Sequence, residues 1–433
     1  METPIYDFLE DYRKKDFVRL HMPGHKGKLY PLLSAAHDIT EIHGADSLFD
    51  ADGIILKSEE NASRLFKSRA SIYSAGGSTL CIQTMLALAM SDKRQIVAVR
   101  SVHRSFIAAC VLLGIEPVWF YPEYSAGFIS GRIDIDKAEE LIKKYDRPCF
   151  YVTSPDYLGR CADIKALADI CHRHGGILIV DNAHGAHFAD TEQHPMICGA
   201  DMCCDSAHKM LPALTGAAYL HINNERFIPF AKQQMKLFAS TSPSYLIMAS
   251  LDLCNKYIEN ELPKKRGYVS QKLMELREKL LGKYTFYQSE PFHLTILCDG
   301  IKLSDRLRLK GIECEYSDRY CLVLLFSPEN TDEDIEKTYN ALESLAKEYG
   351  KCEKLPDRSD FPVMERVMPL REATFSTSEK IPVENSIGRI TAAVDVPCPP
   401  AVPIAVCGER ISEEAINIYR QYNIETVNVV SDS

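Results

Sequence analysis

The sequence lacks the features that mark membrane, secreted and nucleic-acid-binding proteins. No apolar run reaches the roughly 18 residues that a transmembrane helix needs, so we predict no membrane span. The start, Met1 to Phe8, has no basic stretch followed by an apolar one, so we predict no signal peptide and a cytoplasmic location. The formal net charge of -10 disfavours a general nucleic-acid-binding surface.

The 15 cysteines include no Cys-x-x-Cys pair, the usual spacing of thiolate metal sites and redox motifs. Several, such as Cys81, Cys110 and Cys149, lie inside apolar runs. Reduced thiols in the core of a cytosolic protein explain this pattern best. With 433 residues, 46% of them hydrophobic, the chain is long enough for two or three domains with a large core.

From Ser71 to Asp181, short apolar runs alternate with amphipathic segments. We predict strands at 72–74, 95–99, 117–121, 148–153 and 177–181, and helices at 78–90, 103–113, 136–145 and 164–174. This alternation predicts an α/β fold whose mostly parallel sheet is covered by helices on both faces. Ligands bind such sheets at the carboxyl ends of the strands, so the residues that follow each strand are the most informative.

We divide the chain into four parts. Residues 1–55, rich in Gly, Pro, His and Asp, are predicted to form an N-terminal arm of ordered loop, followed by a helix that Ser58 caps. Residues 56–285 form a large domain, 286–350 a smaller α/β domain and 363–433 a C-terminal domain after a charged linker. A long helical stretch from Pro243 to Leu280, interrupted at Pro263, is expected to join the first two domains.

The first candidate for chemistry is a lysine at the tip of a loop. Residues 200–205 and 216–221 are predicted strands, and Ser206-Ala-His-Lys209 lies between them. A lysine in this place can form a Schiff base with a carbonyl or with pyridoxal phosphate (PLP). Taken alone, an ordinary loop lysine is the better interpretation.

Three other groups lie at predicted strand ends. Ser74-Ala-Gly-Gly-Ser-Thr79 could cradle a phosphate at the start of a helix, or could equally be a tight turn with a helix cap. Asp181 ends a strand so apolar that its carboxylate needs a partner, such as a pyridinium nitrogen, although a turn-capping aspartate is also possible. His103 could stack on a planar cofactor or merely cap the next helix.

A metal site is the rival interpretation of the same region. Asp181, His184, His187 and His194 are all possible ligands. The three-residue histidine spacing suits a helix, but Gly185 and the strand-end context argue against one. We therefore predict no metal.

Taken together, these groups follow the order found in PLP enzymes of the aspartate-aminotransferase fold (fold type I). More closely, the sequence resembles the short form of the Orn/Lys/Arg decarboxylase family. The matching stretches span nearly the whole chain and include His21-Met-Pro-Gly-His-Lys26, Gly77-Ser-Thr79, Ser101-Val-His-Arg-Ser105, Val180-Asp-Asn-Ala-His-Gly-Ala-His187, Ser206-Ala-His-Lys209, Ser240-Thr-Ser-Pro-Ser-Tyr245, Ile387-Gly-Arg-Ile390, Pro399-Pro-Ala-Val-Pro403 and Gly408-Glu409.

The resemblance implies PLP as the cofactor and a role for each matched residue. Lys209 would bind PLP as a Schiff base, Asp181 would pair with its ring nitrogen, and His103 would stack on the ring with Ala183 beneath the other face. His184 would lie near the phenolic oxygen or the substrate carboxylate, and His208 or Lys209 would reprotonate the substrate. The phosphate would be held or bordered by Gly77, Ser78, Thr79, Ser206 and His208, and across a homodimer interface by Thr241 and Ser242.

The resemblance also implies decarboxylation of a basic amino acid, arginine before lysine or ornithine, to an amine that feeds polyamine synthesis. Such a side chain needs an acidic partner, for which the candidates are Asp46, Asp52, Glu384 with its neighbour Asn385, and Glu409. The chain departs from the family after its lysine, at Met210-Leu-Pro-Ala-Leu-Thr-Gly216, and at Asp156 and Arg104. The alternatives are a PLP-dependent aminotransferase or lyase, and a degenerate, non-catalytic PLP-binding protein.

Overall fold

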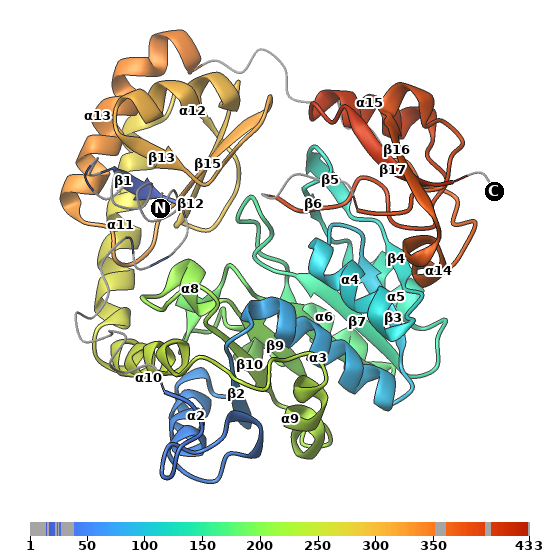
Figure 1. Cartoon of the computed structure of the whole chain (residues 1–433). Coiled ribbons are helices and arrows are strands. Elements are labelled where there is room, and N and C mark those ends of the chain that lie inside the picture. Colours follow the sequence, from blue (N-terminus) through green and yellow to red (C-terminus); the bar gives the residue numbers. More distant parts are fainter. Residues whose placement is uncertain are drawn as a thin grey trace, which may run out of the picture.

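The computed structural model describes residues 14, 17–21, 24, 26, 39–350, 361–394 and 400–431. Its centre is a seven-stranded sheet in the order β2-β10-β9-β8-β7-β3-β4 (Figure 1). Only β10 runs antiparallel to its neighbours, and the other four pairs are parallel. The strands are β2 (Ala70–Ser74), β3 (Gln95–Val99), β4 (Val118–Phe120), β7 (Pro148–Thr153), β8 (Ile177–Asp181), β9 (Met202–Asp205) and β10 (Ala218–Ile222).

Helices cover both faces of this sheet because alternate strand residues point to opposite sides. Ile96 and Ala98 of β3 pack in one core with α3 (Gly77–Ser91), α4 (Arg104–Leu113) and α9 (Ile228–Lys236). Val97 and Val99 pack in another with α5 (Ile135–Ile142) and α6 (Ile164–Arg173). The predicted α/β fold with a mostly parallel sheet is confirmed.

A second domain follows a pair of long helices, α10 (Tyr245–Asn260) and α11 (Leu262–Leu280), as Figure 1 shows. The helix breaks at Glu261 rather than at Pro263, because a proline is tolerated in the first turn of a helix. The antiparallel sheet of this domain has the order β11-β12-β15-β14. The elements of the whole domain are β11 (Thr285–Phe286), β12 (His293–Leu297), α12 (Gly300–Leu309), β13 (Ile312–Cys314), β14 (Tyr316–Ser317), β15 (Cys321–Leu325) and α13 (Asp332–Tyr349).

The C-terminal part lies beside β3, β4 and α4 in Figure 1. Its two strands, β16 and β17, pair antiparallel. A buried ion pair between Arg100, at the end of β3, and Glu409 ties this part to the large domain. The remaining elements are β5 (Glu123–Ala126), β6 (Ser130–Arg132), the 3-10 turns η2 (Leu48–Asp50), η3 (Ala186–Phe188) and η4 (Val383–Asn385), α7 (Pro195–Cys198), α14 (Leu370–Phe375), β16 (Ser378–Pro382), α15 (Glu413–Gln421) and β17 (Thr426–Val430).

The N-terminal arm differs from the prediction of an irregular loop segment. Val18–Leu20 forms β1, which pairs in parallel with β13 of the second domain. Helix α2 (Ile54–Phe66) begins four residues before Ser58, because the carboxylate of Asp46 accepts the backbone N–H groups of Gly53 and Ile55 at its start. Three residues of the predicted arm motif, at positions 22, 23 and 25, and Pro399 lie outside the described residues.

The loop predicted around Lys209 is a single helical turn, α8 (Ala207–Met210). Of the 13 cysteines that lie in the described ranges, ten are buried. Across the same ranges, no helix combines the length and apolar character needed to cross a membrane.

Candidate active site

A cavity of about 260 Å³ lies at the carboxyl ends of β7, β8 and β9, at the point the sheet topology favours for a ligand. It brings together every predicted cofactor residue except Thr241 and Ser242, which are exposed elsewhere on the chain. Its lining comprises Gly77, Ser78, Thr79, Ile82, Ser101, His103, Ser105, Ile129, Thr153, Tyr157, Asp181, Ala183, His184, Ser206, His208, Lys209, Pro400 and Val402.

Lys209 enters the cavity from the one-turn helix α8. Its Nζ lies 3.0 Å from Nε2 of His184. The N-terminal arm contacts this turn, because the backbone N–H of Gly24 donates to the carbonyl oxygen of His208 at 2.6 Å. The side chain of His208 is fixed separately, by its Nδ1 lying 3.0 Å from the carbonyl oxygen of Ala217.

Asp181 ends β8 and is only 3% exposed. Its carboxylate accepts hydrogen bonds from the Ala183 backbone N–H at 3.1 Å and the Tyr151 hydroxyl at 3.4 Å. Burial raises the pKa of Asp181, and the nearby charge of Lys209 opposes that rise. A carboxylate in this position is suited to a cationic ring nitrogen, which would supply the opposite charge that burial demands.

The start of α3 forms the second half of the site. Gly77 has a φ of +69°, in the left-handed region that favours glycine, and it turns the chain from β2 into the helix. Gly77, Ser78 and Thr79 of the first turn line the cavity, and the Gly77 N–H donates to the carbonyl oxygen of Gly216 at 2.8 Å. A helix N-terminus of this kind favours an anion. The Ser78 hydroxyl lies 2.5 Å from that of Ser206, so hydroxyl groups from two elements converge where a phosphate would bind.

His103 caps the next helix, which is one of the two roles that the sequence left open, and it also lines the cavity. Its Nδ1 accepts the backbone N–H of Ser105 at 3.2 Å and so caps α4, while the ring also lines the cavity. Burial, reinforced by the charges of Lys209 and Arg104, lowers the pKa of His103 to about 3. The ring is therefore a neutral, planar surface.

The residues present fit PLP. The chain supplies an amine, a buried carboxylate, a neutral imidazole face and a helix N-terminus flanked by hydroxyl groups. The buried Thr153 hydroxyl, also in the cavity lining, has no hydrogen-bond partner among the described residues. Buried polar groups are nearly always satisfied, so an unpaired hydroxyl facing the cavity points to a polar ligand.

The predicted substrate residues do not reach this cavity within their own chain. Glu409 is buried, bonds Arg100 at 3.1 Å and accepts the Val406 backbone N–H, so it has a structural role here rather than the predicted one. Glu384 is exposed and pairs with both Nε and Nη2 of Arg420, and its neighbour Asn385 is also exposed. Asp46 caps α2 instead of facing the cavity, and Asp52 is exposed.

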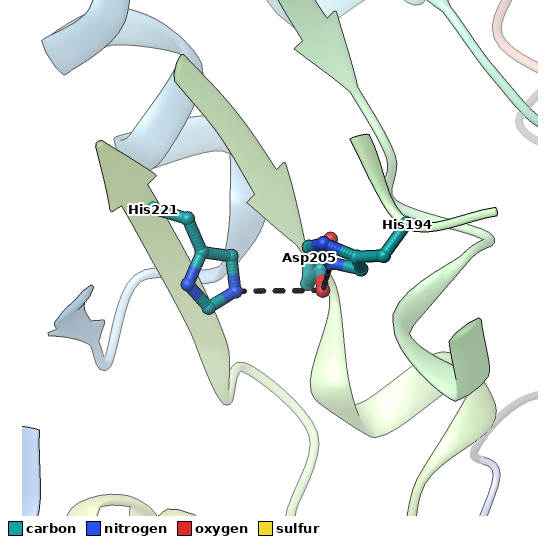
Figure 2. Close-up of side chains that lie close together, drawn as sticks. All are labelled: His194, Asp205 and His221. Carbon is teal, nitrogen blue, oxygen red and sulfur yellow. Dashed lines mark hydrogen bonds and ion pairs between the residues drawn. The ribbon is translucent and has the colours of Figure 1, made fainter. Parts of the chain in front are cut away.

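The four alternative metal ligands are not gathered into one group. His187 bonds Glu290, whereas His194 bonds Asp205 at 2.9 Å. Figure 2 shows that His221 also faces the Asp205 carboxylate, at 3.4 Å from Oδ2. His194 Nδ1 accepts the Met196 backbone N–H, so its proton lies on Nε2 and is donated to Asp205.

Several site residues were missed by the sequence interpretation. Thr153 ends β7 just as Asp181 ends β8, so the strand-end rule that selected Asp181 could have selected Thr153 too. Tyr157 and Val402 carry no such signal, because only the folding of distant segments brings them to the cavity. The same holds for His293 and Glu290, which approach His184 from the second domain.

Comparison with known proteins identifies the family of this chain. The profile for the Orn/Lys/Arg decarboxylase major domain matches residues 3–288, and the profile for the C-terminal domain of that family matches residues 358–427. An arginine decarboxylase of Halalkalibacterium halodurans is 28% identical over 460 residues, covering 98% of this chain and 94% of that protein.

Solved structures show the same fold. The constitutive lysine decarboxylase of E. coli has a TM-score of 0.74 at 18% identity and covers 91% of this chain and 75% of that chain. A structure of SPT with PLP has a TM-score of 0.57 at 12% identity, covering 70% and 79%. The two family profiles together span most of the chain, so this protein belongs to the Orn/Lys/Arg decarboxylase family and is a PLP-dependent amino-acid decarboxylase of fold type I.

Proposed function

We propose that this chain decarboxylates arginine, with lysine and ornithine as less favoured substrates, and that the amine product feeds polyamine synthesis. The observation that carries the chemistry is the contact of Lys209 with His184 in a cavity that also holds Asp181 and the start of α3. The preference for arginine is supported by the relative named an arginine decarboxylase, which aligns with nearly the whole chain.

When bound, PLP supplies an electron sink for the pair of electrons that remains as carbon dioxide leaves. The chain's own residues prepare that step. Asp181 would pair with the protonated ring nitrogen, whose positive charge would offset the burial that raises the pKa of this carboxylate, and the neutral ring of His103 offers an apolar face. Lys209 and His208 both enter from α8, so either can hold the proton that the substrate carbon takes up afterwards.

A guanidinium group needs an acidic partner, and Asp181 is the only carboxylate in the lining found among the described residues. We therefore propose that the partner is supplied across a homodimer interface, where Glu384 with Asn385 remain candidates. The exposure of Thr241 and Ser242 supports the same arrangement, because residues that reach a neighbouring subunit's phosphate would lie on the protomer surface.

The test is a visible absorption spectrum of the purified protein, followed by assays with arginine, lysine and ornithine. We expect an absorption band from covalently bound PLP, loss of that band in Lys209→Ala, and release of carbon dioxide and amine from arginine. Lys236→Ala, which removes an exposed lysine, is the control and should retain both properties.

Release of a keto acid instead of carbon dioxide would show an aminotransferase and refute the proposal. A protein that carries PLP but converts none of the three amino acids would match the non-catalytic alternative.

A further inference from the structure

A chain of buried side chains links Lys209 to the second domain. Lys209 Nζ lies 3.0 Å from His184 Nε2, and His184 Nδ1 lies 3.2 Å from His293 Nε2. His293 Nδ1 in turn makes a short contact with Glu290 Oε1. We propose that His184 and His293, oriented by Glu290, form a proton relay that takes a proton from Lys209 and returns it.

The hydrogen-bond pattern permits one consistent direction along this path. A lysine ammonium can only donate, so His184 accepts at Nε2 and carries its own proton on Nδ1. That proton is donated to His293 Nε2, which leaves the His293 proton on Nδ1, facing the Glu290 carboxylate. Each donor along the path therefore meets an acceptor.

Glu290 is fixed in the orientation that the relay needs. Its carboxylate also accepts the backbone N–H groups of Phe292 at 3.0 Å and His293 at 2.9 Å, and Oε2 lies 3.2 Å from His187 Nε2. A carboxylate that holds the distal nitrogen of a histidine in this way sets the tautomer of the ring and stabilises its protonated form. Glu290 touches no reacting atom, so it acts as a positioning residue behind the two histidines.

The electrostatics assign different parts to the two histidines. Burial, together with the charge of Lys209, lowers the pKa of His184 well below its usual range, so His184 passes the proton on without holding it. Burial would raise the pKa of Glu290, but His187 and His293 lower it overall, so the carboxylate stays ionised. The path therefore ends at the contact of His293 Nδ1 with the Glu290 carboxylate, which is the place we propose for the transferred proton.

Other charged and titratable groups face the path. His103 and His187 face His184, and Arg277 and Cys161 face Glu290. The path crosses between domains at a position where the backbones nearly touch, because a Cβ added at Gly159 would lie 2.4 Å from Cβ of His293. The close approach of the large-domain loop to β12 thus depends on a glycine.

The relay has a role in cofactor binding, because that reaction first removes a proton from Lys209 and later needs a proton. Lys209 must lose one proton before its nitrogen can attack the aldehyde carbon of PLP. The nitrogen then bonds to the aldehyde carbon and passes one of its own protons to the aldehyde oxygen. This oxygen takes up a second proton, from the relay, and leaves as water as the carbon–nitrogen double bond forms. The proton held on His293 returns through His184 for that last step, so the relay ends as it began.

This inference rests on the PLP-dependent function proposed above, and its test needs no amino-acid substrate. PLP is added to the PLP-free protein, and samples are quenched at intervals with borohydride, which fixes PLP to the lysine it has reached. The fraction of Lys209 labelled in this way is measured by mass spectrometry. At pH 7 we expect Glu290→Gln and His293→Gln to label on the order of 100-fold more slowly, as for loss of a general acid–base group. The double variant should be no slower than the slower single variant, because the two residues act in series.

A pH series separates a relay from a structural role. Above the usual lysine pKa of about 10.4, Lys209 loses its proton directly to solvent, so both variants should approach the wild-type rate. Asp318→Asn is the matched control, because Asp318 is a buried carboxylate of the same domain, 8% exposed like Glu290, and should label normally at every pH. Circular dichroism at each pH verifies folding.

Labelling of both variants at the wild-type rate at pH 7 would overturn the relay, as would a defect that persists at high pH. If neither variant folds, His184→Ala opens space on the cavity wall, and added imidazole should then restore labelling; no restoration would also overturn the proposal. A protein that labels normally but does not decarboxylate arginine contradicts the proposed function and leaves the relay intact.

Discussion

Asp205 lies four residues before Lys209 and is fully buried at the end of β9. His194 and His221 face Oδ2, as Figure 2 shows, and Asn182 donates to Oδ1 at 2.6 Å. Burial would raise the pKa of Asp205, but the two histidines lower it overall, so the carboxylate is ionised. This residue connects the segment after Asp181 to the segment before Lys209 and holds both strand ends in place.

We expect Asp205→Asn to destabilise the protein by about 3 kcal/mol, because it leaves buried histidine N–H groups without their acceptor. Urea unfolding of the two proteins measures the difference. Asp305→Asn is the control, since Asp305 is exposed and pairs with the exposed Arg308. Equal destabilisation by the two variants would contradict the structural role of Asp205.

His103 predicts a pH dependence of stability. Its pKa is about 3 in the folded protein, because burial and the charges of Lys209 and Arg104 disfavour the imidazolium, whereas an unfolded histidine titrates near 6.5. As the pH falls from about 6.5 toward about 3, the unfolded state binds a proton that the folded state does not bind, so the free energy of unfolding decreases. His103→Gln should lose less stability than the wild type between pH 7 and pH 5 in urea unfolding; exposed His43→Gln should behave as the wild type.

At the scale of elements, the lysine turn depends on the N-terminal arm. A Cβ at Gly24 would lie 2.6 to 2.7 Å from backbone atoms of Met210, Leu211 and Lys209. The arm itself is anchored to the second domain, because the buried ammonium of Lys26 donates to the carbonyl oxygen of Leu325 at 2.8 Å. The described residues of the arm thus contact both α8 and the second domain.

Gly24→Ala should therefore destabilise the protein by about 1–3 kcal/mol, since backbone atoms must move to admit the methyl group. It should also weaken PLP binding, measured by titrating PLP-free protein with the cofactor. Gly267→Ala, in α11, is the control, because an added Cβ there meets nothing within 4 Å and alanine favours a helix. Unchanged PLP affinity in Gly24→Ala would show that the arm does not support PLP binding.

At the scale of the whole molecule, the proposed homodimer predicts complementation between two inactive variants. In the proposed dimer, one subunit supplies Lys209 to a site and the other subunit supplies Thr241 and Ser242. Lys209→Ala therefore removes one subunit's part of the site, and the double variant Thr241→Ala/Ser242→Ala removes the other subunit's part. In a mixed dimer, one site carries both defects and the other carries neither, so random mixing should restore about a quarter of wild-type activity. Decarboxylation after co-refolding measures this, and no recovery above the separate variants would argue against sites shared between subunits.

The α/β order, the strand ends and the sequence positions of Lys209, Asp181 and His103 could be predicted from local patterns, because hydrophobic period and strand-end position are properties of short segments. The placement of β1 against β13, the burial of Glu409 with Arg100 and the approach of His293 to His184 could not. Each of these contacts joins residues more than 100 positions apart, and its geometry exists only once the domains have packed. Local sequence patterns thus predict which side chains could bind a cofactor, whereas the packing of the domains brings His293 into contact with His184.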